Sequence, residues 1–125
     1  MDDYIPFEIA KKLQEKGYSH GYNDFGYRLI YSDECTIKFI SNIGAYEREY
    51  YGENIPCPAI SQVLKWLREE KKIYLELVVV VDAEYMCDIY KIDIRPIECL
   101  GSTAWFKTYE QAALAGIEYV LDNLI

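Results

Sequence analysis

The sequence predicts an α+β fold, with about three helices and a mostly antiparallel sheet in the order α-β-β-α-β-β-β-α. Two observations lead to this prediction. Three segments repeat their apolar residues at helical spacing, and four segments alternate their side chains between two faces as strands do. The connections between successive strands are short, as in antiparallel hairpins. The chain has 125 residues, a common size for one domain, and we expect a single domain over 1–125.

The first helix is predicted over residues 6–16. Pro6 suits a first helical turn, and Gly17 is a suitable stop after the last turn. Two alternating strands follow at 27–31 and 35–40, and the short polar stretch 32–34 between them predicts a hairpin.

The second helix is predicted over residues 58–71. Its apolar positions form one stripe: Ile60, Val63, Leu64 and Leu67. Lys71 and Lys72 follow in the last turn, where positive charge complements the helix dipole.

A strand is predicted over residues 73–81, and its second face begins with Tyr74 and Glu76 but ends with Val78 and Val80. Because a run of valines on an open edge promotes aggregation, we expect this strand in the centre of the sheet. Val78 and Val80 then need cover, either from another part of the chain or from a second copy in a homodimer.

The chain then returns along a strand over 86–94, which Pro96 ends, and one or two short strands follow within 97–107. The last helix begins after Thr108, and Gln111 stands three residues further on, as in a capping box.

The charge of the chain limits its partners. It contains 13 basic and 21 acidic residues, a formal net charge of −8. Nucleic acids and anionic membranes attract basic surfaces, so we expect neither direct nucleic-acid binding nor membrane binding. The acidic N-terminus has no apolar signal region, and the longest strongly apolar run is too short for a bilayer. The sequence therefore predicts a cytoplasmic protein.

No motif in the sequence predicts a metal, a cofactor or a catalytic site. The four cysteines lie far apart (Cys35, Cys57, Cys87 and Cys99). Structural zinc sites use closely spaced ligand pairs, so we interpret the cysteines as reduced, small apolar residues. His20 stands alone in a Gly-flanked loop, and no Gly-rich phosphate loop is present. Asp82, Glu84 and Asp88 straddle a turn that we interpret as solvated rather than calcium-binding.

The segment 46–51 is the candidate partner surface. It lies in an irregular connection and contains residue types that dominate binding hot spots: Tyr46, Arg48, Tyr50 and Tyr51. Alternatively, the segment is an amphipathic strand or helical turn whose tyrosine rings pack on the domain.

Three segments resemble a family of small proteins encoded by bacterial prophages and conjugative elements. They are Pro58-Ala-Ile-Ser-Gln-Val-Leu-Lys-Trp-Leu-Arg-Glu69, the closing Phe106-Lys-Thr-Tyr-Glu-Gln-Ala-Ala-Leu-Ala-Gly-Ile117, and the opening helix up to Gly17. The resemblance implies a mobile-element origin, but it implies no activity and no site residue.

The sequence thus favours a non-enzymatic accessory protein of a mobile element that acts through protein–protein contacts. Two alternatives stay open. One is a small enzyme whose site is assembled from dispersed carboxylates, tyrosines and His20. The other is an acidic decoy that inhibits a basic DNA-binding protein.

Overall fold

The computed structural model describes the backbone of residues 4–18, 27–31, 37–41 and 55–125, and the side chains of residues 4–18 and 57–125. These residues confirm the α+β class and the predicted order of elements. They fall into two compact units, one that ends at Ala59 and one over Ile60–Ile125. The single domain over 1–125 stays a prediction.

The first unit contains α1 (Phe7–Glu15), β1 (Tyr27–Tyr31), β2 (Ile37–Ser41) and β3 (Ile55–Pro56). β1 pairs antiparallel with β2, as the hairpin prediction requires, and its other edge pairs with β3. The two-residue β3 was not predicted, because so short a strand shows no alternation. α1 begins after Pro6 and ends before Gly17, whose φ of +94° favours glycine.

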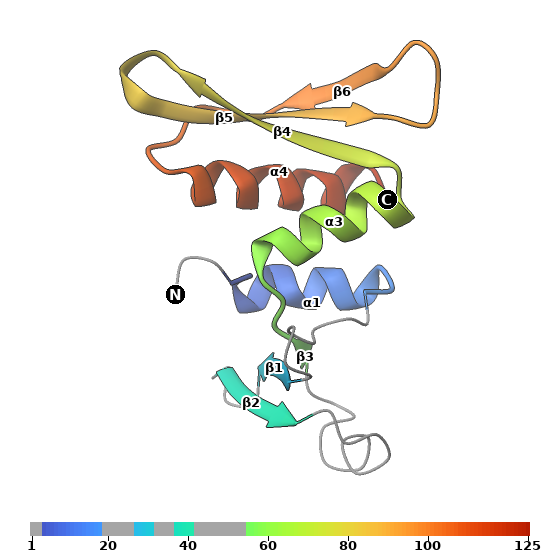
Figure 1. Ribbon diagram of the computed structural model, residues 1–125, viewed down its shortest axis with the longest axis vertical. Coiled ribbons are helices and arrows are strands. Elements are labelled where there is room, and N and C mark those ends of the chain that lie inside the picture. Colours follow the sequence, from blue (N-terminus) through green and yellow to red (C-terminus); the bar gives the residue numbers. More distant parts are fainter. Residues whose placement is uncertain (1–3, 19–26, 32–36, 42–54) are drawn as a thin grey trace. The chain divides into compact units, whose positions relative to one another are not determined.

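The second unit is built on an antiparallel sheet of β4 (Ile73–Val80), β5 (Glu84–Lys91) and β6 (Glu98–Ser102), in the order β4-β5-β6. α3 (Ile60–Glu70) and α4 (Tyr109–Asn123) lie on the same face of this sheet (Figure 1). Here the sequence prediction was wrong in one respect: β4 is an edge strand, and β5 is central. The apolar side chains of β4 indicated that the strand packs against the core. They did not indicate whether one or two strands pair with it.

The core of the second unit lies between the sheet and the two helices. Leu75, Cys87 and Ile89 face the helices and are buried. The helices contribute buried residues: Ile60, Val63 and Leu67 of the predicted α3 stripe, and Ala113, Ile117, Val120 and Leu121 from α4. Leu64, the fourth residue of the predicted stripe, is half-buried. Trp66, which lies outside this stripe, is also buried.

Gly116 sets the distance between α4 and the sheet. A Cβ atom at this position would lie 2.6 Å from Cys87 Sγ and 3.0 Å from a Leu75 methyl carbon. Only glycine lets the helix approach the strands this closely. At the start of the same helix, the predicted capping box is present, because Thr108 and Gln111 exchange side-chain-to-backbone hydrogen bonds.

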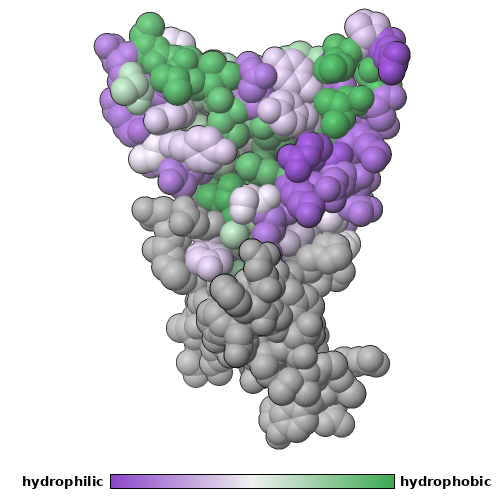
Figure 2. All heavy atoms as spheres, in the orientation of Figure 1, coloured by the Kyte–Doolittle hydropathy of each residue, from purple (hydrophilic) through white to green (hydrophobic). Residues whose placement is uncertain are grey.

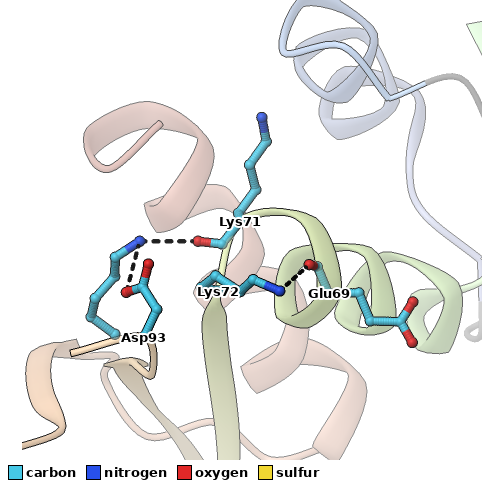
Figure 3. Close-up of polar contacts among 5 residues, drawn as sticks. Glu69, Lys71, Lys72 and Asp93 are labelled. Carbon is cyan, nitrogen blue, oxygen red and sulfur yellow. Dashed lines mark hydrogen bonds and ion pairs between the residues drawn. The ribbon is translucent and has the colours of Figure 1, made fainter. Parts of the chain in front are cut away.

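Lysines close the junction between α3 and β4. Lys72 has a φ of +57°, and its Nζ donates to the Glu69 carbonyl at 2.8 Å. Lys91 Nζ donates to the Lys71 carbonyl at 3.2 Å and also pairs with Asp93 (Figure 3). Lys72 and Lys91 thus donate to carbonyls that a helix end leaves without partners. The sequence prediction gave this role to Lys71 and Lys72, but Lys71 Nζ lies over the Trp66 ring, 5.3 Å from its centroid.

Candidate functional site

The face of the β4–β5–β6 sheet opposite α3 and α4 is the candidate site, and we call it the open face. Strand register places eight side chains of β4 and β5 on it: Tyr74, Glu76, Val78, Val80, Glu84, Met86, Asp88 and Tyr90. Among the described residues of this unit, both α-helices contact the sheet, and they lie on its other face. Within the described part of this unit, the open face is therefore the side of the sheet that neither helix covers.

Apolar or aromatic pairs lie toward both ends of the open face, although Glu84 lies beside the β4–β5 turn. Tyr74 pairs directly with Tyr90 at one end, and Val78 pairs with Met86 toward the other. Tyr74 is exposed, and the other three side chains are half-buried. Directly opposed residues on one face of an antiparallel pair lie about 5 Å apart, so each pair forms one continuous contact surface. Tyrosine and methionine are enriched at protein interfaces.

Two carboxylates lie between these apolar ends. Glu76 and Asp88 are directly opposite each other on neighbouring strands. Ser102 Oγ donates to Asp88 Oδ1 at 2.6 Å. Like charges in directly opposed positions repel, so this pair favours a basic side chain from a partner. Burial raises the pKa of Tyr90, and the charges of Asp88 and Glu76 raise it further, so its hydroxyl stays protonated and can donate a hydrogen bond.

The end of β4 adds exposed apolar surface. Val79 is 64% exposed and Val81 is 67% exposed, although Val79 points to the same side of the sheet as the buried Leu75. Figure 2 shows hydrophobic surface gathered over the turn between β4 and β5. The turn itself reverses through Asp82 and Ala83, which both have positive φ values.

The acidic turn does not bring its carboxylates onto one ligand. Asp82 is exposed in the turn. Glu84 forms an ion pair with Lys107 at 2.9 Å, and Asp88 accepts a hydrogen bond from Ser102. Among the described residues, no group of three His, Cys, Asp or Glu side chains is placed to hold a metal ion. Val81, Asp82 and Ala83 of the turn are exposed, whereas Glu84 and Asp88 are half-buried.

Two of the three described cysteines are apolar core residues, as predicted. Cys57 and Cys87 are buried, whereas Cys99 is exposed, so the prediction was wrong for Cys99. Cys99 lies on β6, whose side chains are less covered than those of the central strand. Burial raises the pKa of Cys87 to about 12, with a smaller contribution from Asp88, so its thiol is an unreactive packing group at neutral pH.

The predicted partner residues Tyr46, Arg48, Tyr50 and Tyr51 lie outside the described residues, as does His20. The structure instead places Tyr74, Met86 and Tyr90 on one face of the sheet, and the sequence analysis did not name these residues as a candidate surface. Their sequence signal was the second apolar face of β4. We used that signal only to place the strand in the sheet, not to identify an accessible surface.

No protein-family model, curated protein or solved structure matches this chain. The resemblance to prophage and conjugative-element proteins therefore stays a prediction. In the part of the chain that the structure describes, no helix is both long and apolar enough to cross a membrane.

Proposed function

We propose that this protein is a non-enzymatic, cytoplasmic accessory protein of a mobile element, and that it acts by binding another protein through the open face. The observation that carries the proposal is the composition of this face. Apolar and aromatic pairs flank two carboxylates on a sheet whose two helices both pack on the other side. Aromatic and apolar anchors beside a small number of charges are typical of protein-binding surfaces.

The arrangement of Glu76 and Asp88 favours recognition over catalysis. Two acids and the nearby Tyr90 are the residue types that the enzyme alternative needs. However, Glu76 is exposed on a sheet surface, where water screens its charge. Catalytic acids work at sites that exclude water and so strengthen electrostatic interactions. The face is better suited to accept an Arg or Lys side chain of a partner.

The test compares capture of a partner by matched variants of the full chain. Val78→Thr combined with Met86→Thr makes the open face polar, and Lys65→Ala changes an exposed side chain on α3, the helix that packs on the other face. The immobilised proteins are exposed to lysate of bacteria that carry the mobile element, and captured proteins are identified by mass spectrometry.

We expect a protein that wild type and Lys65→Ala retain and that the open-face variant loses by tenfold or more. Circular dichroism must show that all three chains are folded. Equal capture by all three folded chains would contradict the proposal, and so would the absence of any captured protein.

A further inference from the structure

We propose that two copies of this protein associate through the edge of β4, which extends the sheet from one copy into the other. This inference goes beyond the proposed function, because it uses the strand edge rather than the open face. It rests on three features: the unprotected edge, the direction of its backbone groups, and the charges at its two ends.

The two edges of the sheet differ in their protection. β6 has five residues, and its pairing with β5 is interrupted by an irregularity beside Tyr90. β4 has eight residues in unbroken register with β5, and Glu76 is its only charged residue. Native proteins protect sheet edges by short strands, bulges, charges or proline. Among the described strands of this sheet, β4 forms an edge that has little of this protection.

The hydrogen-bonding groups of this edge can be assigned from the ladder. The Ile92 N–H donates to the Lys72 carbonyl at 3.0 Å, in the same register as the β4–β5 pairs. Residues that bond to the neighbouring strand alternate along an antiparallel pair. The even-numbered residues of β4 therefore bond to β5. Leu75, Leu77 and Val79 direct their N–H and C=O groups toward the open edge.

A two-fold axis perpendicular to the sheet would pair two such edges antiparallel and keep the helices of both copies on the same side. Leu77 then lies opposite Leu77 of the second copy, and Leu75 lies opposite Val79. This register covers the exposed side chain of Val79 with a buried apolar neighbour. It also places Glu76 opposite Val78, so no acid faces an acid across the new ladder.

Charged residues near the ends of β4 favour this register over the registers that are shifted by one residue. Lys72 precedes β4 and Asp82 lies in the turn that follows it, and antiparallel pairing brings the Lys72 end of one copy beside the Asp82 end of the other. Asp82 has no ion-pair partner among the described residues, and the exposed Lys72 donates to the Glu69 carbonyl, a neutral acceptor that leaves its charge available to a carboxylate. If each copy is shifted by one residue in one direction along the ladder, Glu76 of one copy lies opposite Glu76 of the other. A shift in the other direction moves Lys72 to Glu84, which Lys107 already occupies.

The test begins with sedimentation velocity of the full chain over a range of concentrations, and we expect a monomer–dimer equilibrium. Val79→Pro removes the outward N–H of Val79 and leaves the bonds to β5 intact, so this variant should remain folded and sediment as a monomer. A monomeric wild type, or a dimeric and folded Val79→Pro, would overturn the inference.

Charge reversal tests the register without proline. Lys72→Glu alone and Asp82→Lys alone should each weaken dimerisation by about tenfold, because the two-fold axis creates two such pairs. The double variant Lys72→Glu with Asp82→Lys restores opposite charges and should recover most of the affinity. Failure of the double variant to recover would overturn the paired register.

The outcomes also separate this inference from the proposed function. A monomeric wild type that still loses its partner on Val78→Thr with Met86→Thr refutes the edge dimer and supports binding at the open face. A wild type that dimerises as described but captures no partner supports the edge dimer and refutes the proposed function.

Discussion

The two faces of the β4–β5–β6 sheet both carry apolar side chains, but these side chains have different surroundings. On the helix side, Leu75 and Ile89 are 7% and 0% exposed, because α3 and α4 pack against them. On the open face, Val78 and Met86 are half-buried, although they are equally apolar. The difference teaches that apolar residues in one strand can serve stability on one face and recognition on the other.

The largest expected effect tests this difference in stability. Ile89→Ala removes buried volume beneath the helices and should lower the free energy of unfolding by about 3 kcal/mol. Met86 is on the same strand as Ile89 but faces the other way, onto the open face. Met86→Ala should therefore lower the free energy of unfolding by about 1 kcal/mol or less. Urea unfolding followed by circular dichroism measures both values. Equal costs would show that the open face is covered within the folded chain, and the comparison would fail.

A second prediction concerns how closely α4 approaches the helix side. Gly116→Ala adds a Cβ atom 2.6 Å from Cys87 Sγ, and we expect a loss of about 1–2 kcal/mol in spite of the higher helix propensity of alanine. In a Cys87→Ala background, the same substitution should cost less, because the clashing sulfur atom is gone. A double-mutant cycle measures the coupling. Additive effects would mean that the helix accommodates the methyl group by moving.

The smallest expected effect near neutral pH concerns the burial of Cys87. Folding raises the pKa of this thiol from 9.0 to about 12, so the folded state holds the proton more tightly than the unfolded state does. Its contribution to stability is complete below pH 9 and is lost as the pH rises toward 12. Above pH 9, wild type should lose stability more steeply than Cys87→Ala, by at most about 1.4 kcal/mol per pH unit.

Thermal unfolding at several alkaline pH values checks this slope difference. Cys99 provides an internal comparison, because it is exposed and should react with iodoacetamide at pH 8.5 while Cys87 stays protected. Peptide mapping distinguishes the two thiols. Identical slopes for wild type and Cys87→Ala, or rapid labelling of Cys87, would show that the helix side admits water.

Local signals in the sequence were enough to predict most individual elements. The apolar stripe of α3, the Thr108 capping box and the β1–β2 hairpin depend on residues close together in the chain, and each is present. The prediction ran longer than β5, which ends at Lys91, because alternation continues past the last paired residue. Most of the candidate surface could not be predicted in this way, since Tyr74, Met86 and Tyr90 are brought together by strand pairing.

The sequence by itself determined the class of fold, the order of the elements and the acidic charge, because these follow from composition and from periodicity over a few residues. Only the tertiary structure decided that β4 lies at an edge and that one face of its sheet is open. It also gave Gly116 its role, because a close approach depends on Cys87 and Leu75 from distant strands. The physical reason is that alternation along a strand states which side chains share a face. It carries no information about which strand, helix or solvent lies beyond that face.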